Sequence, residues 1–240
     1  MPNNMEWPGS APQPRDSGSI LINFVLDKSG SMDVVRSATI DGFNEFLRTQ
    51  RGNTGEAWLT LTMFDTQFYE VCRGVPLREV PEMEPGNYVP SGCTALYDAV
   101  ARSIGIADRY LEQLGNRPDQ VLFVIMTDGL ENASREFNQR QVFDMIRDRE
   151  QRGYEFVYLG ANQDAYAVAE TVGVTADNAC NWVASDKGAR RMHERLNQQV
   201  SAYRATGMPH MADLAQSWFE VNEHLGDEDD DASEHGKAAS

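Results

Sequence analysis

The chain has 240 residues, of which 41% are hydrophobic, so it can bury a core of its own and is not a disordered protein. Lys and Arg number 21 and Asp and Glu number 37, which gives a net charge of −16. A surface this acidic repels nucleic acid and anionic membranes, so we expect neither as a partner, whereas it favours cations and basic protein surfaces.

The cysteines and the N-terminal segment indicate the compartment. Cys72, Cys93 and Cys180 stand far apart and form no CxxC pair, which is typical of a reducing compartment rather than of a disulfide scaffold. The N-terminal segment lacks the apolar run of a signal peptide, and no stretch of about 18 apolar residues could span a membrane. We therefore expect a cytoplasmic protein.

Proline content and charge divide the chain into four segments. Residues 1–18 contain four prolines and little that could pack, which predicts a flexible N-terminal arm. Residues 19–184 are expected to form the main domain, and residues 185–222 a C-terminal helical extension. Residues 223–240 include the run GDEDDDASEHGKAAS, which predicts a disordered acidic tail.

Hydrophobic patterns predict strands and helices that alternate along the main domain. In chain order we expect a strand at 19–26, a helix to about residue 51, strands at 57–64 and 68–72, a loop at 75–93, a helix at 96–114, a strand at 120–126, a helix from Asn138 to about Arg152, a strand at 155–160, a helix at 163–172, a strand at 179–183 and a helix at about 186–205.

These elements predict one fold class. The strands at 19–26 and 120–126 are apolar on both faces, as in central parallel strands covered by helices on each side. The strands at 57–64 and 68–72 are three residues apart, which favours a hairpin. We therefore expect an α/β domain with a Rossmann-like, doubly wound and mostly parallel sheet, one antiparallel edge strand and helices on both faces.

Side-chain oxygens gather where the two most apolar strands end. Asp27 follows the first strand in the stretch VLDKSGSMD, and Ser29 and Ser31 come at alternate positions, so all three can face the same way. Asp128 follows the strand at 120–126, and Thr94 stands at the start of a strong helix. Ligands of open α/β sheets lie beyond the carboxyl ends of the strands, so these residues are candidates for one site.

Two carboxylates and three hydroxyls suit a hard divalent cation such as Mg²⁺, which prefers about six oxygen ligands. The hydroxyls add no charge, so the ion stays a good Lewis acid, and a carboxylate from outside could replace one of its waters. Some of these residues, taken alone, could also have a simpler role as a helix cap. Ser31 or Asp33 could cap the next helix, and Thr94 could cap its own.

Taken in order and context, the five residues resemble the metal-ion-dependent adhesion site of von Willebrand factor A domains. The DxSxS motif spans Asp27 to Ser31, Thr94 follows, and Asp128 stands in TDG. The resemblance covers roughly residues 19–184. The stretches GFNEFL, SGCTALYDAV, TDGLENASREF and EFVYLGANQDA particularly resemble the stand-alone A-domain proteins of bacteria and their phages.

The resemblance implies a metal site and a mode of binding. Mg²⁺ or Mn²⁺ would lie at the top of the sheet, with Ser29, Ser31 and Thr94 as direct ligands and Asp27 and Asp128 often acting through water. The protein would be a binding module rather than an enzyme, and the metal would capture a Glu or Asp of a protein partner.

Two other functions stay open at this point. A magnesium-dependent phosphohydrolase could use Asp27 as its nucleophile, but the DxD pattern of haloacid-dehalogenase-type enzymes has an acid where this chain has Ser29. The chain also lacks a phosphate-binding P-loop motif. Alternatively, the protein could be a structural subunit of a phage or bacterial assembly in which the metal only stabilises the fold.

Overall fold

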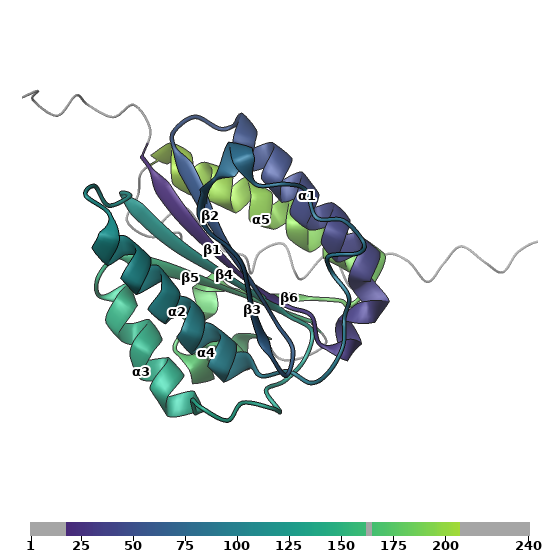
Figure 1. Cartoon of the computed structure of the whole chain (residues 1–240). Helices are drawn as coiled ribbons and strands as arrows, with labels where there is room; N and C mark the ends of the chain where they lie inside the picture. The colour runs from purple at the N-terminus through teal and green to yellow at the C-terminus, as the bar shows by residue number, and fades with distance from the viewer. Residues whose placement is uncertain (1–17, 162–164, 207–240) are drawn as a thin grey trace, which may run out of the picture.

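The structure, a computed structural model, describes residues 18–161 and 165–206 (Figure 1). The predicted arm at 1–18, apart from Gly18, and the predicted acidic tail at 223–240 lie outside the described residues, as does the predicted extension beyond residue 206. The division of the chain into four segments therefore stays a prediction.

Strands and helices alternate as the hydrophobic pattern predicts. The elements are β1 (Ile20–Asp27), η1 (Gly30–Val35), α1 (Arg36–Gly52), β2 (Ala57–Phe64), β3 (Phe68–Pro76), η2 (Leu77–Glu79), α2 (Leu96–Gln113), β4 (Gln120–Thr127), α3 (Gln139–Glu150), β5 (Tyr154–Ala161), α4 (Ala165–Val172), η3 (Ala176–Asn178), β6 (Ala179–Trp182) and α5 (Asp186–Thr206). The short 3-10 helices were not predicted, and β3 is longer than predicted because it continues to Pro76.

The six strands form one sheet in the order β3-β2-β1-β4-β5-β6. β1 lies between β2 and β4 and is parallel to both, while β3 pairs with β2 in the antiparallel direction at one edge. The predicted fold class is therefore confirmed, including the single antiparallel edge strand. The register pairs Leu26 with Met126, so β1 and β4 end side by side.

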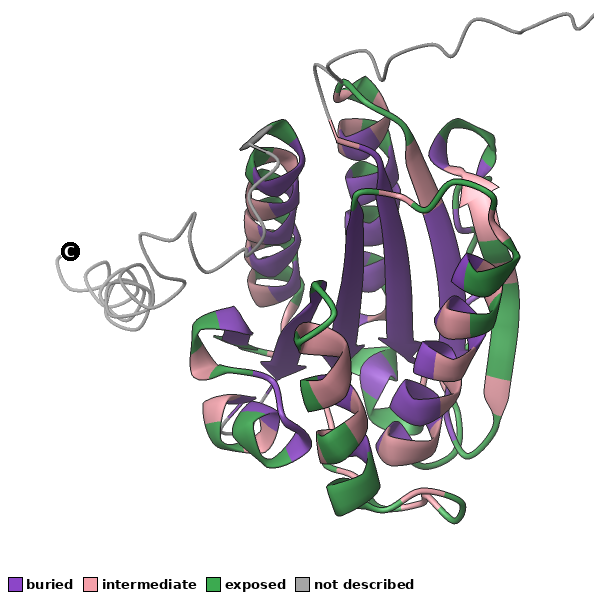
Figure 2. Ribbon diagram, turned by 90° about the vertical axis from the view of Figure 1, so that its left-hand side faces the viewer, coloured by how far each residue is buried: buried purple, intermediate pink, exposed green. Residues whose placement is uncertain are grey.

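Helices cover both faces of the sheet (Figure 1). Alternate residues of β1 point to opposite faces: Phe24 and Leu26 belong to the core under α1 and α5, and Leu21 and Val25 to the core under α2, α3 and α4. β1 and β4 are buried along their whole length, as Figure 2 shows by their purple colour. None of the helices over the described residues is both long and apolar enough to cross a membrane.

α5, the last helix within the described residues, is part of the core of the domain. Its apolar face (Ala189, Met192, Leu196, Val200 and Tyr203) is buried in the same cluster as Phe24 of β1 and Phe43 of α1. The helix approaches α1 so closely that a Cβ atom on Gly42 would overlap the ring of His193. Only a glycine fits at position 42 while His193 keeps its place.

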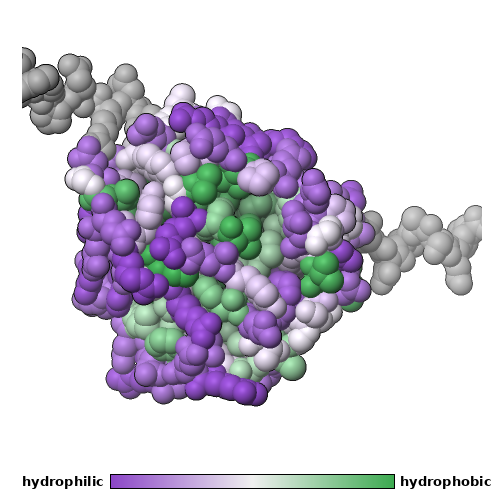
Figure 3. Space-filling view, viewed as in Figure 1, coloured by the Kyte–Doolittle hydropathy of each residue, from purple (hydrophilic) through white to green (hydrophobic). Residues whose placement is uncertain are grey.

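The edge strand β3 is the most exposed strand of the sheet (Figure 2). Tyr69 and Val71 expose 38% and 54% of their surfaces, and Figure 3, which faces this edge, shows hydrophobic residues in the middle with hydrophilic residues around them. An ion pair of 2.6 Å joins Arg73 to Glu70, and register shifts interrupt the pairing with β2. Charges and irregularities of this kind limit pairing between sheet edges of separate molecules.

The contact between Gly42 and His193 predicts an unusual mutational effect. Replacing glycine by alanine inside a helix normally stabilises a protein by about 1 kcal/mol. We expect Gly42→Ala instead to lower the free energy of unfolding by about 2 kcal/mol, because the new methyl group forces α5 away from α1. Urea unfolding measures the change. Gly105→Ala in α2 is the control, since its methyl group would meet only the flexible Arg109 side chain, and it should be neutral or stabilising.

The burial of His193 predicts a loss of stability in mild acid. His193 is 2% exposed, neither ring nitrogen has a hydrogen-bond partner among the described residues, and burial lowers its pKa to about 4. Because the folded protein disfavours the protonated ring, this contribution to stability is complete above about pH 6.5 and falls progressively toward pH 4.

The substitution His193→Phe isolates this contribution from those of the other titrating groups. Between pH 7 and pH 5, the difference in unfolding free energy between His193→Phe and the wild type should change by about 2 kcal/mol in favour of the variant. Parallel stability curves for the two proteins would contradict the assignment.

Candidate metal centre

The pairing of β1 with β4 brings Asp27 to Thr127 at the carboxyl edge of the sheet. Thr127 Oγ1 donates to Asp27 Oδ2 over 2.6 Å, and the backbone N–H of Ser29 donates to Asp27 Oδ1 over 2.6 Å. The hydroxyl of Tyr88 donates to the main-chain oxygen of Asp27, also over 2.6 Å. Asp27 is fully buried, and the bonds from Thr127 and Ser29 fix its carboxylate, while the bond from Tyr88 fixes its main chain.

The two serines of the DxSxS motif lie beside each other and reach the second carboxylate. Ser29 Oγ and Ser31 Oγ are 3.3 Å apart, and Ser31 Oγ donates to Asp128 Oδ1 over 2.7 Å. Because α1 begins only at Arg36, neither Ser31 nor Asp33 is its N-cap. The capping interpretation is therefore wrong for these two residues, and the Ser31 side chain lies at the site instead.

Thr94 comes to the same place from the start of α2. Its N–H donates to Asn132 Oδ1 over 2.9 Å, and its main-chain oxygen accepts from the N–H of Asn132 over 3.0 Å. The N-cap of α2 is Ala95, so Thr94 is not a cap. A Cβ atom on Gly129 would lie 3.1 Å from Thr94 Oγ1 and 3.8 Å from Ser31 Oγ. Both hydroxyls therefore line one small space, which a side chain at position 129 would fill.

The carboxylates of the site are costly to keep ionised without a cation. Burial raises the pKa of Asp27 to about 6, Asp128 adds repulsion, and hydrogen bonds from Thr127 and Ser29 partly offset both effects. Burial also raises the pKa of Asp128, against the hydrogen bond from Ser31. A bound divalent cation would favour the ionised form of both groups.

The lysine inside the DxSxS motif does not neutralise these carboxylates. Lys28 Nζ forms an ion pair of 2.6 Å with Asp65 Oδ2 and lies 4.6 Å from the centre of the Tyr69 ring. Asp65 also accepts from Ser91 Oγ and, as expected of a hairpin-turn residue, from the N–H of Gln67. The positive charge nearest to the motif in sequence is thus paired elsewhere.

The donor set fits a hard cation rather than a transition-metal site. Over the described residues there is no cluster of three or more His, Cys, Asp or Glu side chains that could hold a metal. The structure instead brings together two carboxylates and three hydroxyls, namely those of Asp27, Ser29, Ser31, Thr94 and Asp128. Oxygen donors of this kind match the preference of Mg²⁺.

Sequence reasoning missed the residues that hold the five candidates in place. Thr127 fixes Asp27, Tyr88 fixes the end of β1, and Asn132 fixes Thr94. Thr127 stands directly before Asp128 in the TDG motif, so its position next to a predicted strand end was a usable signal. Tyr88 and Asn132 lie in loops, where the sequence carries no periodic pattern.

Comparison with solved structures identifies the fold. The chain matches proximal thread matrix protein 1 from the mussel byssus, solved with a zinc-occupied MIDAS motif (TM-score 0.56, 13% identity, 77% of this chain and 46% of that one). It also matches the von Willebrand factor domain of the type V pilus tip protein Mfa5 from Porphyromonas gingivalis (TM-score 0.58, 9% identity, 78% and 97%). The chain has the von Willebrand factor A fold.

Further comparisons mark the limits of this likeness. This chain also matches the pilus adhesin SpaC from Lactobacillus rhamnosus GG, with a TM-score of 0.59 and 13% identity over 78% of this chain and 30% of that one. This chain thus spans less than half the length of the mussel and SpaC proteins that it matches. No family model and no curated protein matches the sequence.

The buried charge of Asp27 predicts that replacing this residue by asparagine stabilises the metal-free protein. In Asp27→Asn the amide carbonyl can still accept from Ser29, and Thr127 can donate to the main-chain oxygen of Gly129 instead, 3.1 Å away. Removing a buried charge should raise the unfolding free energy of the metal-free protein at pH 7 by about 2 kcal/mol.

Urea unfolding in EDTA at pH 7 and pH 5 tests this expectation. Because the pKa of Asp27 is raised from 3.8 to about 6, the wild type should recover about half of the difference at pH 5 and the rest as the pH falls toward 3.8. Asp65→Asn is the matched control, since it breaks the buried ion pair with Lys28 and should destabilise the protein. A loss of stability in both variants would contradict the account.

Proposed function

We propose that this protein is a metal-dependent binding module of the adhesion type, and not an enzyme. A divalent cation, Mg²⁺ or Mn²⁺, binds at the carboxyl edge of the sheet and captures an acidic residue of a protein partner. The residues proposed to hold the metal are Asp27, Ser29, Ser31, Thr94 and Asp128.

The observation that carries the proposal is the balance of charge within the donor set. Asp27 and Asp128 together offset the two positive charges of the ion, and the three hydroxyls contribute oxygen atoms without further charge. Mg²⁺ prefers about six oxygen ligands, so the five protein groups leave room for an oxygen atom from outside the protein. The two carboxylates are held in place by other hydrogen bonds. A carboxylate is the natural choice, because it supplies both an oxygen atom and a negative charge.

Exposed apolar side chains near the site support a protein as the partner. Val34 follows Ser31 by three residues and is 74% exposed, and Leu130 follows Asp128 by two residues and is 58% exposed. Val89, two residues before Ser91, is 50% exposed, and the N–H of Ser91 donates to the main-chain oxygen of Lys28. Apolar residues around a polar centre are typical of protein interfaces.

The surroundings of Asp27 favour binding over catalysis. Both carboxylate oxygens already accept hydrogen bonds, from Ser29 and Thr127, so a nucleophilic attack by Asp27 would first have to break them. The neighbours in structure include a matrix protein and a pilus adhesin by name. We also propose that the protein works in the cytoplasm of a bacterial cell, whether or not the cell is infected by a phage. The three free cysteines support a reducing compartment.

Metal-dependent stability and partner capture in the same variants test the proposal. At about 100 times its dissociation constant, Mg²⁺ should add about 2.7 kcal/mol to the unfolding free energy of the wild type. Ser31→Ala should lose most of this gain, because it removes a ligand, and it should also lose the partner from a lysate. Ser91→Ala is the matched control: this serine lies nearby but binds Asp65 rather than the site, so both properties should persist.

The outcomes separate the three functions. A partner held by the wild type only with Mg²⁺, and lost when one of its own Asp or Glu residues is replaced by Ala, supports the adhesion proposal. Stabilisation by metal with a partner held equally in EDTA would favour a structural subunit. Metal-dependent release of phosphate from an aryl phosphate, abolished by Asp27→Ala, would overturn the proposal in favour of a phosphohydrolase.

A further inference from the structure

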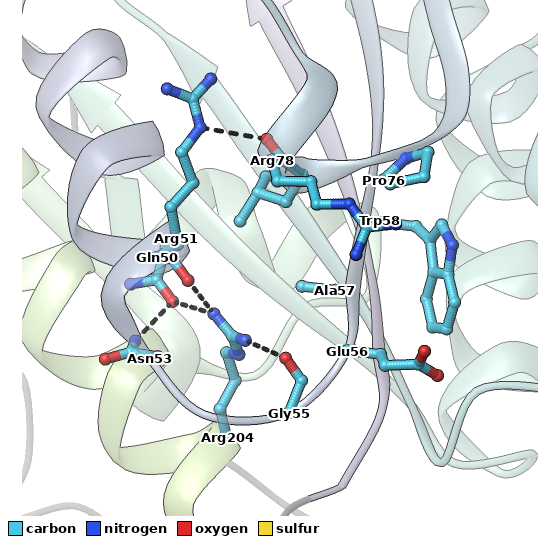
Figure 4. A pocket seen from close by; sticks show the side chains of 11 residues that line it. Gln50, Arg51, Asn53, Gly55, Glu56, Ala57, Trp58, Pro76, Arg78 and Arg204 are labelled. Atoms are coloured by element: carbon cyan, nitrogen blue, oxygen red, sulfur yellow. Dashed lines mark hydrogen bonds between the residues drawn. The ribbon is translucent and has the colours of Figure 1, made fainter.

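A cavity of about 250 Å³ opens at the edge of the sheet opposite to the metal centre (Figure 4). It lies between the end of α1, the start of β2 at Ala57, the end of β3 at Pro76, and Arg204 of α5. Since β1 is eight residues long, the cavity is roughly 25 Å from the candidate metal ligands. The proposed metal-dependent function makes no use of it.

The charge of this cavity is opposite to that of the protein. Three arginines line it, Arg51, Arg78 and Arg204, together with the single acid Glu56. In Figure 4 the carboxylate of Glu56 points away from Arg204. In a chain of net charge −16, three cations around one small cavity form a local site of positive potential.

Arg204 is a buried cation that has no carboxylate partner among the described residues. It is 2% exposed, and its guanidinium donates to four neutral oxygens. Nη1 donates to the main-chain oxygen of Gln50 over 2.6 Å and to its side-chain Oε1 over 3.1 Å, and Nη2 donates to the main-chain oxygens of Thr54 and Gly55, each over 3.3 Å. Its Nε–H has no acceptor within the described part of the chain. The carbonyl groups at the end of α1 offset part of the charge. A buried cation without an anion remains costly, and a bound anion would remove that cost.

Arg78 lines the same cavity, and in Figure 4 its side chain extends toward Trp58. The Arg78 side chain is 81% exposed, and its ion-pair contact with Glu79 is long at 3.4 Å. Its guanidinium is therefore available to a ligand. Trp58 stands next to it and adds a flat aromatic wall to the lining.

We infer that this cavity binds a small organic anion that carries a phosphate or carboxylate group. The anionic group binds the exposed guanidinium group of Arg78, whose planar shape suits either kind of anion, and the buried positive charge of Arg204 nearby attracts it further. The uncharged part of the ligand packs against Trp58. The site is independent of the metal centre and of the partner bound there.

Calorimetric titration of the full chain with inorganic pyrophosphate, and separately with citrate, tests the inference. EDTA in the buffer keeps the metal centre from contributing. We expect saturable binding of at least one of the two anions, and the one that binds more tightly identifies the preferred group. Arg78→Gln should weaken that binding about tenfold, because one charged hydrogen-bonding partner is lost.

Arg140→Gln is the matched control, since Arg140 is 83% exposed and also contacts a single acid, Asp144, but lies on α3 away from the cavity. It should leave the affinity unchanged. Anion binding should also quench tryptophan fluorescence in the wild type and not in Trp58→Phe. Arg204 itself is a poorer choice for substitution, because its loss would also uncouple α5 from α1.

Three results would overturn the inference. Absence of saturable binding for both anions would mean that Arg204 only caps the end of α1. An equal loss of affinity in Arg78→Gln and Arg140→Gln would mean that the anions respond to general surface charge. Quenching that persists in Trp58→Phe would place the anion elsewhere. None of these results bears on the metal-dependent function, which is measured through Ser31 and Ser91.

Discussion

The parallel pairing of β1 with β4 is the constraint on which the candidate site depends. It places the last residues of both strands at one edge, so that Thr127 meets Asp27 at 2.6 Å. A shift of one residue in this register would turn every side chain of a strand to the opposite face of the sheet. The buried residues on the two faces of β1 oppose such a shift, and the packing of the core thereby sets the position of the polar group at the end of the strand.

The site concentrates negative charge that the surrounding structure leaves uncompensated. Lys28 stands next to Asp27 in sequence, yet its ammonium group is paired with Asp65. The absence of a side chain at Gly129 preserves a space between the hydroxyls of Ser31 and Thr94. An arrangement that lowers the stability of the empty protein while keeping oxygen atoms close together is expected where a ligand supplies the missing interaction.

Local patterns predicted the elements, and contacts between distant residues account for most of what they missed. β2 was predicted at its observed bounds, and the predicted start of a helix at Asn138 agrees with the structure, in which Asn138 and Gln141 form a capping box at the start of α3. The alternation in DxSxS was enough to bring three candidate residues to one side. The bonds from Thr127 to Asp27 and from Arg204 to Gln50 join residues 100 and 154 positions apart, so no periodic pattern in the sequence predicts them. The pairing of β3 with β2 contains register shifts, which the sequence of a single strand also does not reveal.

The separation of α1 and α5 in sequence has a consequence for biosynthesis. α1 and α5 share one face of the sheet, but the bond between Gln50 and Arg204 joins residues 154 positions apart. At roughly 5–20 residues per second, a ribosome needs about 8–30 s to make the chain between them. During that time α5 is absent, so the core around Phe24 and Phe43 is not yet fully buried. The nascent chain therefore presents an apolar face to the chaperones of the cell until translation of α5 is finished.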